Sequence, residues 1–499
     1  MSEDSRKIGQ AWRRMNKLNV LAVAYLFLPL LIFSAGWLTP VVSIPLLAVT
    51  CYALYRAITS MNSVGRSQTS FSWPELTAVF VLLLAGCVVC GQGGIFFQDV
   101  DWPKHNAILR DLTERPWPVV YDGDALLTYY IGNYIIPALI GKFFSSVSVS
   151  FLILPFWNAF GFLLVYCLTA DYLRADTWWK KALLIFFLFF WGGAPNLGSR
   201  IYQAFGHDVL LNSYKWIDFE HVNVHFSPNF DAIRGTFQHV IAPWICTALF
   251  LQHRDRTDLY VLFALPLLFT ATFGFLFFAI ILFCMLVVQI ARQRSVRQVF
   301  SAPNLLLLPM AGTLLLYLAG NFLADKPDLF GFAFLNMFLE LDFYLAFTVS
   351  EFLMYAIFLF HRHRRDVLFY IVVAELLLIP FVSLGHFNDL CSRGSIPARF
   401  LLMVWCLQEL YDGRMKNLAA WGIAAFLLVA VRNEGRELQF VIQKSAEVGF
   451  RQEICMQDEY GSLNGFAGNG DIWPDNAYNY YTMHYHDSLF YMISRHSEK

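Results

Sequence analysis

The sequence predicts an all-α polytopic membrane protein, and two observations carry that prediction. The chain of 499 residues is 57% hydrophobic and only 15% charged, whereas a soluble domain would carry about 25% charged residues. Apolar runs of about twenty residues, the length that a helix needs to cross a bilayer, recur along most of the chain. This composition excludes an ordinary soluble domain.

Hydropathy predicts about 13 membrane-spanning helices after a basic N-terminal segment, residues 1–17. The first apolar run is too long for a signal peptide and lacks a small-residue cleavage site, so we expect it to be an uncleaved first span. The expected spans are residues 18–38, 41–58, 76–97, 148–170, 182–194, 240–251, 259–270, 271–290, 305–319, 343–360, 367–384, 396–410 and 418–431.

One more apolar stretch, residues 125–144, is ambiguous, and the distribution of positive charge decides its placement. If this stretch does not cross the membrane, every later basic cluster lies in the cytoplasm with the basic N-terminus, as the positive-inside rule requires. These clusters are Arg174/Lys180/Lys181, Arg254/Arg256, Arg292/Arg294/Arg297, Arg362/Arg364/Arg365 and Arg414/Lys416. We therefore expect residues 125–144 to form a helix at the outer membrane interface.

This topology divides the chain into a cytoplasmic N-terminus, a transmembrane domain and an extracytoplasmic cap. The transmembrane domain covers residues 18–431 and the cap covers residues 432–499. The outer loops are residues 98–147, 195–239, 321–342 and 385–395. The inner connections are short, so we expect function on the outer face. The net charge of −1 argues against a nucleic-acid partner, because no domain has a dominant basic field.

A charged stretch follows directly on the third predicted span. Asp99 and Asp101 are the candidate catalytic residues, because a carboxylate at the membrane rim can act as a general base or bind a divalent cation such as Mg²⁺ or Mn²⁺. Lys104 and His105 are candidates for substrate positioning and begin a predicted amphipathic helix on the membrane. The alternative is a solvated loop with a helix cap, in which the histidine has only a water partner.

Two later outer segments carry further candidates for substrate binding. They are Gln238, His239, Asn388, Asp389, Arg393 and Arg399. Gln238 and His239 open a predicted span and should lie near the outer rim. Arg393 and Arg399 are candidates for binding a lipid phosphate or pyrophosphate, because a guanidinium matches phosphate in a forked geometry. The alternatives are an ion pair with Asp389 and snorkelling of an arginine to the headgroups.

The acidic stretch and the apolar segment after it resemble the first outer loop of GT-C glycosyltransferases. The resemblance covers residues 76–181 and rests on the two aspartates and on Tyr129 and Tyr130 before Gly141 and Lys142. Beyond that range it extends only to the general architecture. Two extra spans precede the acidic loop, and the sequence lacks the lead-in and tail signatures of particular subfamilies, so the subfamily stays open.

The resemblance implies both a structure and an activity. The structure is a first outer loop with two membrane-parallel helices, which residues 102–113 and 125–144 would form. The activity is an inverting transfer of sugar from a polyprenyl-phosphate donor to a glycan, lipid or protein acceptor. The transfer would take place on the periplasmic face of a bacterial inner membrane. Asp99 or Asp101 would act as the base, and Tyr129 would contact the substrate.

Three other functions are compatible with parts of the sequence. A ligase or polymerase of lipid-linked glycans usually has its essential residues in one large late loop, whereas the reactive groups here come early. A transporter or flippase predicts internal repeats and several polar residues at midplane, of which only Glu375 clearly qualifies. A non-catalytic assembly protein would have no cleft joining Asp99 to Arg393.

Overall fold

The computed structural model describes most of the chain. The described residues are 17–61, 69, 71–98, 101–204, 206, 210–212, 215–217, 223–322, 332–334, 341–384, 388–413, 417–450, 462–463 and 480–496. Of the predicted functional residues, only Asp99 lies outside them.

Long apolar helices make this an all-α fold of the membrane-protein type. Within the described residues, seven helices are long and apolar enough to cross a membrane, and a pair bent by 57°, α8 with α9, would make an eighth. The seven are α2 (Lys17–Trp37), α3 (Pro40–Met61), α7 (Val147–Tyr172), α13 (Thr272–Gln293), α14 (Ala302–Phe322), the continuous helix of α15 (Leu341–Thr348), η6 (Val349–Leu353) and α16 (Met354–His363), and α20 (Leu418–Val448).

Shorter helices account for the larger number of spans that hydropathy predicts. Several predicted spans correspond to apolar helices of fewer than eighteen residues, among them α4, α12 and α17. The shorter α-helices are α4 (Trp73–Val89), α5 (Trp102–Glu114), α6 (Ile135–Phe143), α8 (Trp178–Phe190), α9 (Pro195–Ala204), α10 (Asn229–Gly235), α11 (Ile241–Gln252), α12 (Tyr260–Thr270), α17 (Val367–Leu378), α18 (Asp389–Gly394) and α19 (Ile396–Gly413). The 3-10 turns are η2 (Ile131–Asn133), η3 (Phe237–His239), η4 (Thr257–Leu259), η7 (Ile379–Phe381), η10 (Tyr485–Asp487) and η11 (Tyr491–Ile493).

Within the described residues, three small antiparallel sheets join segments between the helices. The first has the order β1–β2–β8 and pairs Leu126 with Thr482. Its strands are β1 (Val120–Tyr121), β2 (Ala125–Leu127) and β8 (Tyr481–Thr482); the others are β3 (Leu210–Asn212), β4 (Lys215–Ile217) and β5 (Asn223–Val224), and β6 (Phe332–Phe334) with β7 (Val382–Leu384). The first sheet therefore ties the C-terminal segment to the first outer loop.

The segment 125–144 differs from the single helix that the sequence predicts. It contains β2, η2 and α6, so only its second half is helical. Gly123 and Asp124 adopt φ angles of 77° and 62° and turn the chain back, so that β2 pairs with β1. The apolar pattern did not reveal this strand, because its second partner, β8, lies near the other end of the sequence.

Helix α5 forms where the sequence predicts a helix, but its apolar face has a different neighbour. Pro103 occupies the first turn, where its missing N–H costs no hydrogen bond. The face is expected to lie on the membrane; instead it packs inside the protein against α6 and α7. Its buried apolar residues are Trp102, Ala107, Ile108, Leu109 and Leu112. Helix α5 is therefore a fixed support for the residues at its start.

Two predicted element ends are also displaced. Helix α20 continues from the predicted span 418–431 to Val448, so the expected boundary of the cap at residue 432 falls within a helix. The predicted span ends where charged residues begin, because the hydropathy falls there. The helix itself continues, because Arg and Glu are good helix formers. The predicted span 367–384 ends in β7, which pairs with β6.

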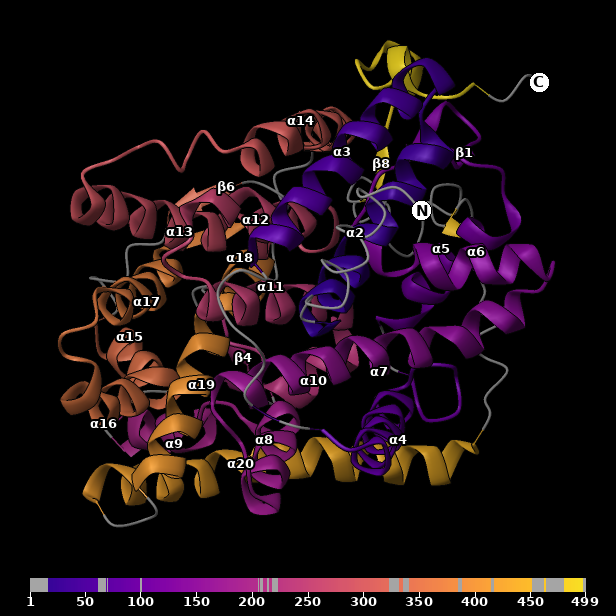
Figure 1. Ribbon diagram of the computed structural model, residues 1–499. Helices are drawn as coiled ribbons and strands as arrows, with labels where there is room; N and C mark the ends of the chain where they lie inside the picture. Colours follow the sequence, from indigo (N-terminus) through magenta and orange to yellow (C-terminus); the bar gives the residue numbers. More distant parts are fainter. Residues whose placement is uncertain are drawn as a thin grey trace.

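Figure 1 shows where the helices of the predicted first outer loop lie. Helices α5 and α6 lie on the opposite side of the molecule from α15 and α16, and α20 runs along one edge. The C-terminal segment lies beside the start of α3, where Leu38 forms a β-bridge with Ser494. The Leu463 N–H also donates to Asp111 Oδ2 in α5 at 2.9 Å.

Candidate functional site

Residues from five distant parts of the chain converge at one place. The charges that act on Asp101 include those of Lys104 and Arg393. Arg393 in turn interacts most strongly with Asp389 and Tyr129. His239 is affected by Arg393, and Tyr480 by Lys104 and Tyr129. The predicted early acidic loop and the predicted late arginine thus belong to one cluster, which we call the Asp101–Arg393 site.

An ion pair at the start of α5 forms one side of this site. Lys104 Nζ lies 2.6 Å from Asp101 Oδ1, and the side chains are 14% and 47% exposed, respectively. Burial by itself raises the pKa of Asp101, but the neighbouring Lys104 ammonium holds it well below its usual value. Burial lowers the pKa of Lys104, whereas Asp101 raises it above its usual value. Both groups are therefore charged across the physiological pH range.

His105 supports the site from behind and does not face it. Its Nδ1 and the Tyr134 hydroxyl are 2.6 Å apart, and its Nε2 lies 3.0 Å from the Gly235 carbonyl. Because a carbonyl only accepts, Nε2 carries the proton and Nδ1 accepts from the tyrosine. Burial, with a smaller effect of Lys104, lowers the pKa of His105 to about 3. This neutral, fully engaged histidine is a positioning residue for α5.

Aromatic packing holds α5 against the segment before α11. The indole of Trp102 stacks on Phe237 at 5.4 Å between centroids, and the His105 ring lies 5.1 Å from Phe237. A Cβ added at Gly235 would lie 3.6 Å from Asp101 Oδ2. The end of α10 and η3 therefore pack directly behind the acidic loop, which no sequence pattern indicates.

Arg393 forms the opposite side of the site, on the short helix α18. Its Nη1 lies 3.1 Å from Asp389 Oδ2, and their side chains are 11% and 37% exposed. Burial lowers the pKa of Arg393, but Asp389 holds it above its usual value. Within the described residues, the Arg393 Nε–H has no acceptor. One donor of this guanidinium is therefore available to a ligand.

Asn388 has a structural task at the start of α18. It adopts a φ angle of 47°, which asparagine tolerates better than most residues. Its Oδ1 accepts from the Cys391 N–H at 3.3 Å, and the residue is 1% exposed. Its side chain turns back onto its own helix and caps it. Its contact with substrate stays a prediction.

Three tyrosines line the site between these charges. The rings of Tyr129 and Tyr130 lie 4.6 Å apart, and Tyr480 lies 4.9 Å from Tyr129. Behind them the ring of His239 lies 4.7 Å from Tyr130. We call Tyr129, Tyr130 and Tyr480 the tyrosine wall. Tyr480 was missed as a site residue, because the tail contains several tyrosines and spacing does not single out this one.

His239 and Gln238 are buried beside the tyrosine wall. They are 0% and 1% exposed. Among the described residues, neither ring nitrogen of His239 and neither amide atom of Gln238 has a hydrogen-bond partner. Buried polar groups without partners are rare, and a bound ligand or water is one common explanation. Burial, together with the nearby Arg393, lowers the pKa of His239 well below its usual value.

Arg399 lies outside the Asp101–Arg393 site. Its Nη1 donates to the Ser227 carbonyl, and its guanidinium lies over the rings of Trp191 and Phe226 at 5.5 and 5.7 Å. The carboxylates that act on it most strongly are Glu351 and Glu434. Arg399 therefore belongs to a separate buried cluster, and its binding of a donor phosphate stays a prediction.

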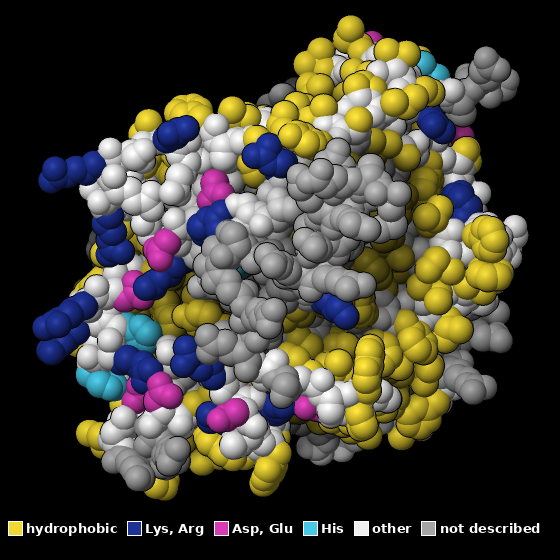
Figure 2. Space-filling view, viewed as in Figure 1, with side chains coloured by type: hydrophobic (Ala, Val, Ile, Leu, Met, Phe, Trp, Pro, Cys, Tyr) yellow, Lys and Arg dark blue, Asp and Glu magenta, His cyan; other side chains and the backbone are white. Residues whose placement is uncertain are grey.

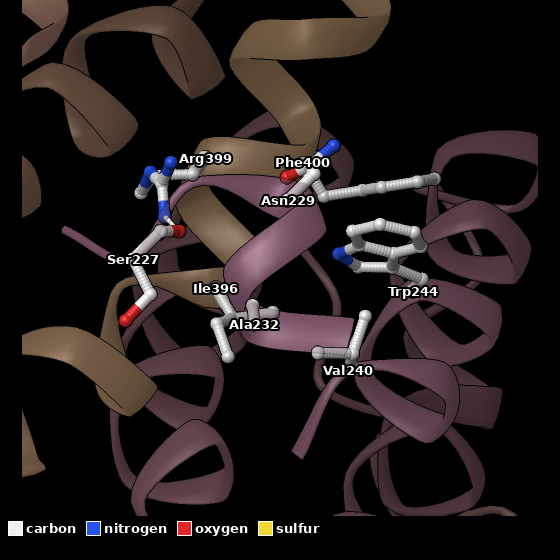
Figure 3. Close-up of a pocket in the computed structure, with 8 residues that line it drawn as sticks. All are labelled: Ser227, Asn229, Ala232, Val240, Trp244, Ile396, Arg399 and Phe400. Atoms are coloured by element: carbon white, nitrogen blue, oxygen red, sulfur yellow. Dashed lines mark hydrogen bonds between the residues drawn. The ribbon is translucent and has the colours of Figure 1, made fainter. Parts of the chain in front are cut away.

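A small cavity adjoins this buried arginine. Figure 3 shows Arg399 and Ser227 on one side of it and the stacked rings of Trp244 and Phe400 on the other. Its volume of about 10 Å³ is enough for about one water molecule. The cavity is too small for a sugar or a phosphate.

The described residues do not by themselves build a metal centre. Among them, no group of three or more His, Cys, Asp or Glu side chains is arranged to hold a metal ion. Asp101, a predicted ligand for Mg²⁺ or Mn²⁺, is paired with Lys104. The charge available to offset an anionic substrate here comes from Lys104 and Arg393.

Comparison with known proteins assigns no family. No family model matches the chain, and no curated protein matches it.

Proposed function

We propose that this protein is a membrane glycosyltransferase of GT-C type. It would move a sugar from a polyprenyl-phosphate donor to an acceptor hydroxyl, with inversion at the anomeric carbon. The observation that carries the proposal is the convergence of the acidic loop with Arg393 and Lys104 in one site. Such a transfer needs a base for the acceptor and cations for the departing phosphate, and both lie here.

The two cations suit the leaving group. Lys104 and Arg393 are close enough to disfavour each other's charge, and an anion between them would relieve that repulsion. Charge-assisted hydrogen bonds from fixed cations to a phosphate strengthen as negative charge develops on it. Arg393 offers its free Nε–H for this contact.

Asp101 or Asp99 acts as the base in this proposal. In the structure Asp101 is paired with Lys104, which makes it a weak base. A donor phosphate that binds Lys104 would draw the ammonium away from Asp101, and the carboxylate would then accept the proton of the acceptor hydroxyl. Donor binding would thereby prepare the base.

The proposed setting is a bacterial inner membrane, with about 13 crossings, the N-terminus in the cytoplasm and the C-terminus in the periplasm. Exposed basic residues support one charged, cytoplasmic side. Figure 2 shows Lys and Arg side chains gathered on one side of the visible face, over the ends of α13, α16 and α17. Exposed basic residues near the ends of α13 and α16 include Arg292, Arg294, Arg297, Arg364 and Arg365.

The decisive experiment removes both acidic groups. The double variant Asp99→Ala/Asp101→Ala, expressed at the normal level, should lose sugar transfer, measured as release of free polyprenyl phosphate from a panel of lipid-linked sugars. Asp122→Ala, at an exposed position in the β1–β2 turn, is the matched control and should keep full activity. If the double variant retains sugar transfer, the proposed mechanism is wrong.

One observation favours a transporter as the second candidate. Glu351, Glu375 and Glu434 are 2%, 6% and 1% exposed and lie in helices. Buried acids in membrane helices often carry protons or ions. Substrate uptake into proteoliposomes without chemical change, abolished by Glu375→Gln, would support this candidate and contradict the transferase.

A further inference from the structure

The C-terminal segment brings a residue into the Asp101–Arg393 site. The Thr128 N–H donates to the Tyr480 carbonyl at 2.8 Å, and the hydroxyls of Thr128 and Thr482 are 2.8 Å apart. On the other side, Asn321 Nδ2 donates to the Tyr481 carbonyl at 2.7 Å. These bonds involve the backbone of the tail and the side chains around Tyr480, so the position of its backbone does not depend on its own ring.

The ring of Tyr480 lies within the site and not merely over it. It packs at 4.9 Å and 54° to Tyr129, and the charges that act on it are those of Lys104, Asp101 and Arg393. It is 8% exposed, as is Tyr130. Asp101 and Asp389 are more exposed, at 47% and 37% of their side chains. The tyrosine wall is therefore the buried part of the site, and the two carboxylates are at its exposed edge.

The composition of the wall indicates which part of a substrate it contacts. The face of an aromatic ring carries partial negative charge and attracts the polarised C–H bonds on one face of a sugar ring. A phosphate would instead bind to Lys104 and Arg393. The site therefore has one apolar side and one cationic side, which is the division found in a sugar phosphate.

We infer that Tyr480 contacts the substrate, and that its ring, with those of Tyr129 and Tyr130, stacks on the sugar of the donor while Lys104 and Arg393 hold the phosphate. This inference rests on the proposed function. It makes the tail a part of the binding site and assigns to it the recognition of the sugar, as distinct from the lipid carrier.

The test distinguishes recognition of the sugar from binding of the lipid carrier. The full-length protein in detergent is titrated with a short-chain polyprenyl phosphate, and then with a panel of the same carrier bearing single hexoses or pentoses. The wild type should bind at least one sugar-bearing carrier more tightly than the bare carrier. Tyr480→Ala should lose that margin, by about tenfold, while its affinity for the bare carrier stays unchanged.

Three further variants distinguish loss of the sugar contact from loss of folding. Tyr480→Phe keeps the ring and should keep the margin, whereas Tyr480→Leu keeps the apolar volume without the ring and should lose it. Tyr491→Ala removes a tyrosine from the same tail, where the ring packs on Tyr485 and His486, and should behave as wild type.

Each other result contradicts the inference in a recognisable way. If Tyr480→Ala keeps the sugar margin, Tyr480 does not contact the sugar, and the proposed function stands. If Tyr480→Ala also loses the bare carrier, or if Tyr480→Phe loses the margin, stacking is the wrong role. If the wild type binds neither carrier, the proposed function itself fails and the inference fails with it.

Discussion

Arg393 and Arg399 are six residues apart in the sequence, yet they occupy unlike places. Arg393 pairs with Asp389 at 3.1 Å on the short helix α18, near Lys104 and Asp101. Arg399, near the start of α19, is 4% exposed and is enclosed by a carbonyl, two aromatic rings and two acidic residues. Residue type and position predict the same task for both, because both are arginines near one predicted membrane rim.

The difference lies in the groups that surround each guanidinium, and these groups distinguish a ligand site from a structural cluster. A guanidinium has five donors. Around Arg399, aromatic faces and a backbone carbonyl occupy most of the surface of the group. Around Arg393, a single carboxylate is the ion-pair partner and the Nε–H points to no acceptor among the described residues. Among the described residues Arg399 Nη2 also lacks a hydrogen-bond partner. The two arginines therefore differ in their surroundings: Arg393 lies beside a carboxylate that is 37% exposed, whereas Arg399 is 4% exposed and adjoins a cavity of about 10 Å³.

The largest expected effect follows from removing Arg399. Arg399→Met would remove the positive charge that acts on the buried Glu351 and Glu434 and leave the Ser227 carbonyl without this donor, which should cost about 3–5 kcal/mol of stability. The thermal unfolding temperature in detergent and the yield of folded protein should both fall. The folded fraction should still bind polyprenyl phosphate with normal affinity; weakened binding by that fraction would place Arg399 in the ligand site after all.

Arg393→Ala should show the opposite pattern. Its loss removes a preorganised cation from the departing phosphate, so sugar transfer should fall by about 10²–10³-fold. The unfolding temperature should change little, because Arg393 is at the edge of the site and its partner Asp389 is 37% exposed. Arg393→Lys should recover part of the rate. A large loss of stability with normal transfer per folded molecule would make the two arginines equivalent.

Protonation of His105, which lies next to the Asp101–Arg393 site, makes the stability of the folded protein depend on pH. Its pKa of about 3 in the folded protein lies below the usual 6.5, so the unfolded chain takes up the extra proton between these values. Stability is therefore complete above about pH 6.5 and falls as the pH decreases toward 3, by at most about 1.4 kcal/mol per pH unit.

Thermal unfolding from pH 7 to pH 4.5 measures this contribution. His105→Asn cannot become charged in this range, so its curve should be flatter than that of the wild type, although it starts lower. His361→Asn is the control, because His361 is exposed at the end of α16, away from the site. Parallel curves for the wild type and His105→Asn would contradict the assignment of a buried neutral histidine.

The smallest expected effect concerns the start of α18, which carries Arg393. Asn388→Ala removes a helix cap and should cost about 1 kcal/mol, whereas Asn388→Gly should cost only a few tenths. Both effects should appear in the unfolding temperature. A raised KM for the donor with unchanged stability would instead support a contact of Asn388 with substrate.

Local patterns in the sequence predict much of the fold. Helix α5 begins at Trp102, as the predicted helix over residues 102–113 does, and most predicted spans lie on observed helices. The pattern failed at β2, where the hydrogen-bond partner is the tail. It also failed to end α20 correctly, since a helix continues through charged residues that hydropathy excludes. In both cases the deciding interaction is not a property of the local apolar pattern.

The same distinction applies to the candidate site: local patterns predict some of its residues, and the others depend on the tertiary fold. Asp101, Lys104 and Arg393 could be named from residue type and topology, because charges at a membrane rim are costly without a function or a partner. Tyr480 could not be named, since only strand pairing with β2 selects it among the tail tyrosines. His105 was assigned to substrate because a sequence does not show that Tyr134 and Gly235 already engage both ring nitrogens.

The sequence by itself determined that this chain is helical and apolar enough for a membrane, and it selected the charged residues worth considering. Apolar length and charge are additive along a chain, so a single sequence reports them directly. Only the tertiary structure decided which of those charges meet. The fold placed Arg393 of α18 near Asp101 and enclosed Arg399 in the interior. Such contacts depend on the whole fold, because each joins residues that no local pattern connects.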